Sequence, residues 1–269
     1  MTNKLSSARV LRESWRDLEK MLKSRRFTVF LDFDGTLTPV HSRPELAELS
    51  EVMRGKLARL VSRVRVVIVS GRDRTDVAEL VGLEDLIYAG CHGFDIREPG
   101  LPPIPTFEGA ATLAEVSELG SVIKSAVDSV VGVIVKVKQW AVAVHYRRVA
   151  DGESEELENK VMNLVRGFPK FRARSGRKVI EIIPNVDWHK GMAVLWLSKI
   201  FDELDGGSSI PIYVGDDITD EDAFRSLAGK GITVFVNSNR DLTAADYCVD
   251  DSEEVGRFLD KLFHLAAIN

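Results

Sequence analysis

A short apolar segment, residues 27–31, ends directly in an acidic turn, and this junction constrains the fold more than any other feature. The segment reads Phe-Thr-Val-Phe-Leu, a composition typical of a strand that is buried on both faces. The next five residues, Asp32-Phe33-Asp34-Gly35-Thr36, are rich in the residue types that form turns. The chain is therefore expected to carry two carboxyl groups at the carboxyl end of a buried strand.

Similar strands alternate with helical patterns on both sides of a different middle region. Leu11, Trp15, Leu18 and Leu22 have the spacing of an amphipathic helix. The alternation predicts a parallel, doubly wound sheet, in which ligands bind beyond the carboxyl ends of the strands. The further elements expected in this α/β core are helices over about 45–61 and 75–81, strands over 64–69, 86–89, 210–214 and 232–236, and helices from about Lys190 and from Ser252.

The middle of the chain has a different pattern, with strand-like runs joined by short turns. We expect helices over about 109–130 and 153–166, and strand-like runs over 133–138, 141–146, 171–174 and 178–183. Neighbouring runs joined by short turns favour an antiparallel sheet. The sequence therefore predicts a smaller α/β cap domain, residues 97–185, inserted between the two parts of the core, residues 1–96 and 186–269.

The pair Asp32 and Asp34 suggests a bound cation. Two carboxylates this close repel each other in a partly desolvated site unless a cation lies between them or one is protonated. Mg²⁺, which prefers oxygen ligands, suits the arrangement. The alternatives are an ordinary Asp- and Gly-rich turn or half of a calcium loop, although Leu37, Pro39 and Val40 do not supply the further oxygen ligands that a calcium loop needs.

A second acidic cluster, residues 215–222, follows the strand predicted over 210–214, and we expect one strand of the sheet to separate it from Asp32. Its later acids are explained by helix capping, with Thr219 as the N-cap and Asp220 in the first turn. The pair Asp216-Asp217 at the end of the strand is better explained by metal ligation. Whether Asp217 or Asp220 also contacts the metal stays open.

Two further segments offer groups that bind phosphate. Ser70 has a hydroxyl donor and Gly71 an unobstructed backbone amide, at the end of another predicted strand. Lys190 stands at a helix start and supplies the kind of point charge that binds phosphate well. Each feature is ordinary by itself, and their combination with the acidic clusters predicts a phosphate site.

Taken together, these motifs resemble the haloacid-dehalogenase superfamily of phosphatases, and within it the trehalose-phosphatase family. The likeness covers about residues 27–260, and the first and last motifs specify chemistry rather than substrate. The sequences that carry the resemblance are LDFDGTL from Leu31, VSGR from Val69, AGCHG from Ala89, VHYR from Val144, VIEIIP from Val179, HKG from His189 and GDDITDEDAF from Gly215.

The resemblance implies a role for each matching residue. Asp32 would be the nucleophile, and Asp34 the general acid and then the base. Ser70 and Lys190 would hold the phosphoryl group. The remaining implied residues are the Mg²⁺ ligands Asp32, Asp34 (through its backbone carbonyl) and Asp216, and the substrate-binding residues Gly71, Arg72, His92, Gly93, Lys138, His145, Arg147 and Glu181.

Two positions depart from the family pattern. Lys136 stands where an acidic residue is usual, and Arg177 stands where lysine is usual. Both positions lie in the predicted cap domain. They leave the phosphoryl chemistry untouched and bear on which sugar is recognised.

Composition limits the partners. The formal net charge of −5 argues against nucleic acid and anionic membranes as partners. Residues 1–26 lack an uninterrupted apolar stretch, so we expect neither a signal peptide nor a membrane span. Two cysteines, Cys91 and Cys248, form neither a disulfide framework nor a zinc pattern. We therefore expect a cytoplasmic monomer that acts on a small sugar phosphate.

Three other functions remain open at this stage. The chain would also suit a phosphatase of another sugar phosphate, such as sucrose phosphate or a glycosyl-phosphoglycerate. A phosphomannomutase-like enzyme would need a bisphosphate activator. A catalytically silent sugar- or metal-binding regulator is disfavoured by the joint presence of Asp32, Asp34, Lys190 and Asp216.

Overall fold

The computed structural model describes residues 8–39, 47–105, 111–176, 178–237 and 242–266. It contains two compact units, Met1–Pro103 with Trp188–Asn269, and Ile104–Asp187. Arg177, one of the two departures from the family pattern, lies outside the described residues. Among the helices that the model describes, none is both long enough and apolar enough to cross a membrane.

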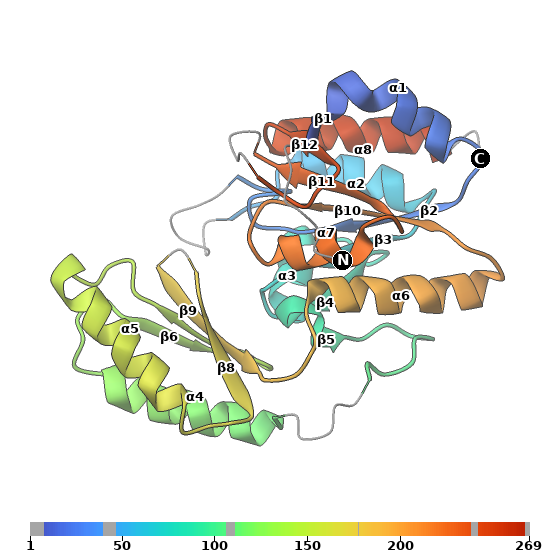
Figure 1. Cartoon of the computed structure of the whole chain (residues 1–269). Coiled ribbons are helices and arrows are strands. Elements are labelled where there is room, and N and C mark those ends of the chain that lie inside the picture. The colour runs from blue at the N-terminus through green and yellow to red at the C-terminus, as the bar shows by residue number, and fades with distance from the viewer. Residues whose placement is uncertain (1–7, 40–46, 106–110, 177, 238–241, 267–269) are drawn as a thin grey trace. The chain divides into compact units, whose positions relative to one another are not determined.

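The first unit is built on an eight-stranded sheet with the order β1-β12-β11-β10-β2-β3-β4-β5 (Figure 1). All neighbouring strands are parallel except β4 and β5, which are antiparallel. The strands are β1 (Arg9–Val10), β2 (Phe27–Leu31), β3 (Val66–Val69), β4 (Ile87–Gly90), β5 (Asp95–Ile96), β10 (Ile210–Gly215), β11 (Ile232–Val236) and β12 (Tyr247–Val249).

Helices cover both faces of this sheet, which confirms the predicted doubly wound α/β class. Figure 1 shows α1 and α8 above the sheet and α6 below it. Helix α8 illustrates how these helices pack. Its buried apolar residues recur at helical spacing: Val255, Phe258, Leu259 and Leu262. The helices of this unit are α1 (Leu11–Leu22), α2 (Glu51–Val61), α3 (Arg74–Val81), α6 (Lys190–Asp205), α7 (Asp220–Leu227) and α8 (Ser252–Ala266).

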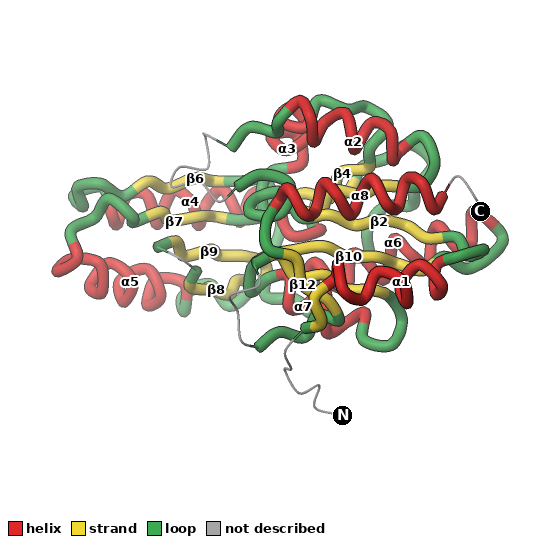
Figure 2. The backbone as a smooth tube through the Cα atoms, turned by 90° about the horizontal axis from the view of Figure 1, so that it is seen from above, coloured by secondary structure: helices red, strands yellow, loops and turns green. Residues whose placement is uncertain are grey.

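The order of the strands corrects one expectation about the site. β10 pairs directly with β2, from Ile210 opposite Phe27 to Val214 opposite Leu31. No strand therefore separates the two acidic clusters, and Figure 2 shows β2 and β10 side by side. Both strands end at the same edge of the sheet because they are parallel.

Two other expectations about this unit were incomplete. The helix predicted over 45–61 begins at Glu51, where the Ser50 side chain accepts a hydrogen bond from the Met53 amide at 3.2 Å, and residues 45 and 46 lie outside the described residues. The short strands β1, β5 and β12 were not predicted. Each has only two or three residues, which is too few for an alternation to be recognised.

The second unit has an antiparallel sheet with the order β6-β7-β9-β8, as the short turns predicted. Val142, Val144 and Tyr146 lie in its apolar core, on the face that packs against the helices. Whether the inserted domain begins at residue 97 and ends at 185 stays a prediction. The elements are β6 (Ile134–Val137), β7 (Val142–His145), β8 (Phe171–Ser175), β9 (Val179–Pro184), α4 (Leu113–Val127) and α5 (Asp151–Val165).

Helix α4 is shorter than the predicted range 109–130, and a capping box explains its start. The Thr112 hydroxyl accepts a hydrogen bond from the Glu115 amide, while the Glu115 carboxylate accepts one from the Thr112 amide at 2.8 Å. The same carboxylate accepts a hydrogen bond from Lys170 at 2.8 Å. Residues 109 and 110 lie outside the described residues.

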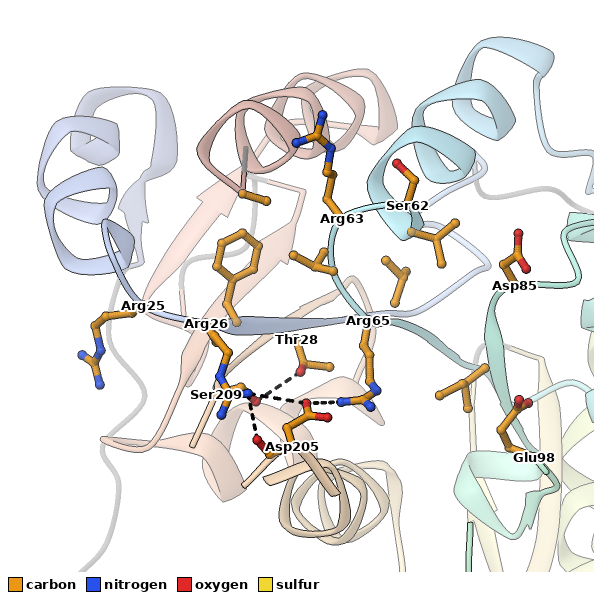
Figure 3. A pocket seen from close by; sticks show the side chains of 16 residues that line it. Arg25, Arg26, Thr28, Ser62, Arg63, Arg65, Asp85, Glu98, Asp205 and Ser209 are labelled. Atoms are coloured by element: carbon orange, nitrogen blue, oxygen red, sulfur yellow. Dashed lines mark hydrogen bonds and ion pairs between the residues drawn. The ribbon is translucent and has the colours of Figure 1, made fainter. Parts of the chain in front are cut away.

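A cavity of about 540 Å³ opens at the amino ends of the core strands (Figure 3). Arg26 precedes β2 and Arg65 precedes β3, and both form ion pairs with Asp205 there. The catalytic motifs predicted from the sequence lie at the opposite edge, beyond the carboxyl ends of these strands. The cavity is therefore distinct from the candidate active site.

Candidate active site

Four segments that are distant in the sequence meet at the carboxyl edge of the core sheet. Asp32 follows β2, Ser70 follows β3, Asp216 follows β10, and Lys190 is the first residue of α6. Each of the three strands is built mainly of apolar residues and is buried along its length, so the polar residue that follows it lies at this edge. The predicted convergence of carboxylates and an ammonium group is present.

Lys190 forms the centre of a buried ionic cluster. Its Nζ donates hydrogen bonds to Asp32 Oδ1 at 2.7 Å and to Asp220 Oδ1 at 2.8 Å. The three residues are 3%, 5% and 0% exposed. Burial by itself would lower the pKa of Lys190, but Asp220 and Asp32 raise it well above its ordinary value. The side chain is therefore held as an ammonium ion.

The carboxyl group of Asp32 is held in a low-dielectric environment. Burial raises its pKa well above the ordinary value, and Lys190 opposes that shift, while Asp220 and Asp216 add to it. Lys190 is thus the group that favours the ionised, nucleophilic form of Asp32.

Asp220 lies in the first turn of α7, as predicted, but its side chain has a role that the sequence did not reveal. Its Oδ1 accepts hydrogen bonds from Lys190 and from the Tyr213 hydroxyl, the latter at 2.6 Å. Its Oδ2 accepts hydrogen bonds from the backbone amides of Asp216 and Asp217, both at 3.0 Å. With four donors, Asp220 fixes the Lys190 ammonium and the backbone that carries Asp216.

Asp216 and Asp217 are neighbours in sequence but have different surroundings. Asp217 Oδ1 accepts hydrogen bonds from the amide and the hydroxyl of Thr219, at 2.6 and 2.7 Å. It also accepts one from the amide of Asp220, the first residue of α7, at 3.3 Å, and so caps this helix. Thr219 is the N-cap residue of α7, as predicted, but its side chain makes no capping hydrogen bond, because its hydroxyl donates to Asp217. Burial disfavours ionisation of Asp217, but Lys190 and Thr219 outweigh it and lower its pKa.

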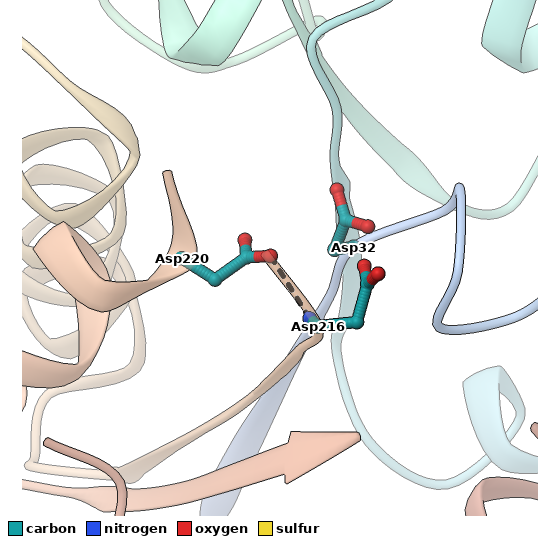
Figure 4. A group of neighbouring side chains, drawn as sticks. All are labelled: Asp32, Asp216 and Asp220. Atoms are coloured by element: carbon teal, nitrogen blue, oxygen red, sulfur yellow. Dashed lines mark hydrogen bonds between the residues drawn. The ribbon is translucent and has the colours of Figure 1, made fainter. Parts of the chain in front are cut away.

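The donor set at this edge fits a hard divalent cation. Asp32, Asp216 and Asp220 each offer an oxygen, and these oxygens lie within 4.8 Å of one another (Figure 4). Burial and then the charges of Asp220 and Asp217 raise the pKa of Asp216 to about 8. A cation beside these carboxylates would offset their mutual repulsion. Because Asp220 already accepts four hydrogen bonds, Asp32 and Asp216 are the better ligands.

Gly35 makes room for Asp216. Its φ is +88°, a left-handed conformation that glycine adopts without strain. A Cβ atom at this position would lie 2.1 Å from Asp216 Oδ2, so any other residue would displace this carboxylate. The Thr36 hydroxyl lies 3.5 Å from Asp216 Oδ1. The glycine of the acidic turn therefore shapes the cation site.

The turn after β4 brings His92 next to the predicted phosphate-binding residues, which follow β3. Ser70 Oγ accepts a hydrogen bond from the Arg72 amide at 3.1 Å, and the His92 amide donates to the Ser70 carbonyl at 2.8 Å. A Cβ atom on Gly71 would lie 2.8 Å from His92 Cε1. Ser70, Gly71, Arg72 and His92 thus form one compact group.

The turn that carries His92 and Gly93 has a strained backbone. Cys91 and His92 both have positive φ, 49° and 58°, which is rare for residues with a side chain. The turn is held in place by the Trp188 indole, whose Nε1 donates to the Gly93 carbonyl at 2.9 Å. Sequence reasoning placed these two residues near the site only through the family resemblance.

Asp34 and Arg72 form a pair that the sequence did not predict. Arg72 Nε donates to Asp34 Oδ2 at 2.7 Å, and Nη2 donates to Asp34 Oδ1 at 2.6 Å. Asp34 was expected to be an acid–base catalyst and Arg72 to bind substrate. The order of the strands explains the contact, because β2 and β3 are neighbours and both motifs follow their carboxyl ends.

The predicted sugar-binding residues lie in the second unit. Lys138 donates a hydrogen bond to Glu181 at 2.9 Å. Glu181 lies opposite Ala143 in the sheet, so it shares with Ala143 and His145 the face turned away from the apolar core. Arg147 follows β7 and is exposed. The roles of these four residues toward a sugar stay predictions.

Comparisons with known proteins identify the family. The family model described as trehalose-phosphatase matches residues 30–253. A probable trehalose-phosphate phosphatase 3 from Oryza sativa subsp. japonica is 38% identical over 256 residues, covering 89% of this chain and 70% of the relative. A trehalose-phosphate phosphatase from Mycobacterium bovis is 35% identical over 244 residues, covering 90% of this chain and 62% of the relative.

Solved structures share the fold. The C-terminal domain of trehalose-6-phosphate phosphatase from C. albicans has a TM-score of 0.78 at 21% identity, covering 97% of this chain and 99% of that one. A trehalose-6-phosphate phosphatase related protein has a TM-score of 0.77 at 23% identity, covering 89% and 98%. Because the family model spans most of the sequence and includes both acidic clusters and Lys190, the chain belongs to the trehalose-phosphatase family.

Proposed function

We propose that this protein hydrolyses trehalose 6-phosphate to trehalose and inorganic phosphate, with Asp32 as the nucleophile. The observation that carries the proposal is the contact of the Lys190 ammonium with Asp32 inside a buried acidic cluster. Family membership supports the reaction class, since the relatives are named as trehalose-phosphate phosphatases.

The residues at this edge suit a double displacement. An oxygen of Asp32 attacks phosphorus, and the bond to the sugar oxygen breaks, which leaves an aspartyl-phosphate. A sugar alkoxide is a poor leaving group, so Asp34 gives it a proton as the bond breaks. Asp34 then takes a proton from the water that hydrolyses the aspartyl-phosphate. This hydrolysis releases inorganic phosphate and regenerates the Asp32 carboxylate.

The remaining groups stabilise charge on the phosphoryl oxygens. Lys190 and the Ser70 hydroxyl are the proposed donors, and such electrostatic positioning dominates phosphoryl transfer. Mg²⁺, held by Asp32, Asp216 and the Asp34 carbonyl, would supply further positive charge there when bound. His92, Gly93 and Gly71 are proposed to contact the phosphorylated end of the substrate.

In the second unit, Lys138, His145, Arg147 and Glu181 are proposed to recognise the sugar hydroxyls. Supporting this, His145 and Glu181 share one face of the sheet, and Lys138 is paired with Glu181. Charged side chains that offer both donors and acceptors suit a ligand with many hydroxyl groups.

The substrate is tested with a panel of sugar phosphates and a free-phosphate readout. We expect trehalose 6-phosphate to be the preferred substrate over sucrose phosphate and glycosyl-phosphoglycerates, in the presence of Mg²⁺ and with no bisphosphate activator. A higher kcat/KM for another sugar phosphate would overturn the substrate assignment. If the protein hydrolyses neither a member of the panel nor a generic aryl phosphate, the proposed activity is overturned.

We extend the proposal to a monomer that acts in the cytoplasm without a nucleic acid or membrane partner. The net charge of −5 supports it, as does the finding that neither Cys91 nor Cys248 forms a disulfide. Light scattering after size-exclusion chromatography measures the oligomeric state.

Replacing Asp34 by asparagine is expected to lower kcat for trehalose 6-phosphate by about a hundredfold or more, the scale of general acid–base catalysis. Asparagine keeps the size of the side chain but cannot exchange a proton with the sugar oxygen. Phosphate release at saturating substrate measures the change. Turnover within about threefold of the wild type would rule out the acid–base role.

Removing the cation is expected to make stability depend on pH. The pKa of Asp216 is raised to about 8, so without a cation the folded state retains a proton that the unfolded state releases. The stability of the chelated protein should therefore fall as the pH rises from about 4 to 8, and the increase in Tm caused by Mg²⁺ should grow over the same range.

Thermal unfolding with EDTA and with Mg²⁺ measures both trends. Asp216→Asn should abolish the effect of Mg²⁺ on Tm. Asp222→Asn should preserve it, because Asp222 lies on α7 and is not one of the three grouped carboxylates Asp32, Asp216 and Asp220. An equal Mg²⁺ effect on Tm at pH 5 and pH 8 would contradict the assignment of Asp216 as a ligand.

A further inference from the structure

The contact between Arg72 and Asp34 has the geometry of a bidentate fork. Both oxygens of the Asp34 carboxylate accept a hydrogen bond from the same guanidinium, at 2.6 and 2.7 Å. Two parallel bonds fix the plane of the carboxylate as well as its position. An ordinary ion pair, with one bond, would leave the carboxylate free to rotate.

Arg72 is the better anchored partner of the two. Its side chain is 15% exposed, whereas that of Asp34 is 45% exposed. The Arg72 amide donates to Ser70 Oγ, and its carbonyl accepts a hydrogen bond from the Cys91 amide at 2.7 Å. Its guanidinium also lies 5.5 Å from the ring centre of Phe33, which is fully buried. Arg72 therefore determines where the Asp34 carboxyl lies.

The fork leaves Asp34 able to exchange protons. Each carboxylate oxygen has two lone pairs, and the fork uses one on each oxygen. The remaining lone pair on each oxygen stays available to a substrate group on the side away from Arg72. A carboxyl group held in this way keeps one fixed orientation toward that group, and a misplacement of about 1 Å at a reacting atom costs on the order of a hundredfold in rate.

We propose that Arg72 is a positioning residue, which holds the Asp34 carboxyl in the orientation needed to give a proton to the leaving sugar oxygen. This inference rests on the proposed function, because it assigns Arg72 to the proton-transfer step of that reaction. It differs from the substrate-binding role implied by the family resemblance, in which Arg72 would contact the phosphoryl group directly.

The two roles predict different dependence on the leaving group. An aryl phosphate releases a phenolate that needs little help from a proton, whereas a sugar phosphate releases an alkoxide that does. A positioning residue for the acid therefore affects kcat/KM for the sugar phosphate alone. A residue that binds the phosphoryl group affects both substrates, because they share that group.

The test compares kcat/KM for trehalose 6-phosphate and p-nitrophenyl phosphate in the wild type, Arg72→Lys, Asp34→Asn and the double variant, all with Mg²⁺. Lysine keeps the positive charge and loses the fork. We expect Arg72→Lys to lower kcat/KM about tenfold or more for trehalose 6-phosphate and less than about threefold for p-nitrophenyl phosphate. In the Asp34→Asn background it should lower the value for trehalose 6-phosphate by less than about twofold.

Equal losses on both substrates, or losses that multiply in the double variant, would show that Arg72 acts independently of Asp34 and would overturn the inference. Arg257→Lys on α8, where Arg257 pairs with Glu253 and Glu254, is the control and should change neither value. Arg72→Gln repeats the comparison if Arg72→Lys unfolds at a lower temperature. A wild type that hydrolyses p-nitrophenyl phosphate but no sugar phosphate would refute the proposed function instead.

Discussion

Replacing Asp32 by asparagine should abolish turnover while the protein stays folded. The amide cannot attack phosphorus, so no aspartyl-phosphate forms, and we expect phosphate release to fall at least about a thousandfold. Stability should be kept or increased, because burial, Asp220 and Asp216 raise the pKa of Asp32 despite the opposing charge of Lys190, and Lys190 keeps Asp220 as a partner. The substitution therefore separates catalysis from folding.

Phosphate release and thermal unfolding are measured on the same preparation. Asp17→Asn is a suitable control, since Asp17 is an exposed carboxylate on α1 that is replaced in the same way. Turnover by Asp32→Asn above about a tenth of the wild-type rate would mean that another group is the nucleophile.

Replacing Lys190 by methionine should abolish turnover and also destabilise the fold. The substitution leaves Asp32 and Asp220 buried without a positive partner, at 5% and 0% exposure. Breaking a buried ion pair by removing one partner costs about 3–5 kcal/mol. Urea unfolding measures the free energy, and phosphate release measures the activity.

A double variant shows which charge causes the instability. If repulsion between the uncompensated carboxylates is the cause, Lys190→Met with Asp32→Asn should regain part of the stability and none of the activity. Lys199→Met, which removes a lysine that is 75% exposed on the same helix, is the matched control. A Lys190→Met protein as stable as the wild type would show that the cluster does not need this ammonium.

Much of the core followed from short-range sequence patterns. The strand before Asp32 and the strand before Asp216 are short apolar runs that end in polar residues, and both occur as predicted. Ligand sites in such sheets lie beyond the strand ends, so the convergence of Asp32, Asp216 and Lys190 was accessible without a structure.

The separate roles of the carboxylates in the second acidic cluster could not be predicted from the sequence. Asp216, Asp217 and Asp220 have the same functional group and lie within five positions, so the sequence does not distinguish them. Their roles depend on where the backbone turns after β10: Asp216 lies beside Asp32, Asp217 caps α7, and Asp220 accepts the Lys190 ammonium. The Tyr213 hydroxyl that completes this arrangement lies within a strand that looked purely structural.

The pairing of strands and side chains that are distant in the sequence could not be predicted either. Nothing local in the sequence requires β10 to lie next to β2, and the fork between Arg72 and Asp34 joins side chains 38 positions apart. Such contacts depend on strand order, which hydrophobic periodicity does not encode.

The direct pairing of β2 with β10 has a consequence for biosynthesis. Asp32 emerges from the ribosome 158 positions before Lys190, and the neighbour that completes its strand pairing comes later still. A nascent chain that ends before this point has β2 without β10 on one side, and sheets that depend on such distant partners form slowly and expose strand edges. Truncated products should therefore be inactive and prone to aggregation, and chaperones would be needed most during this interval.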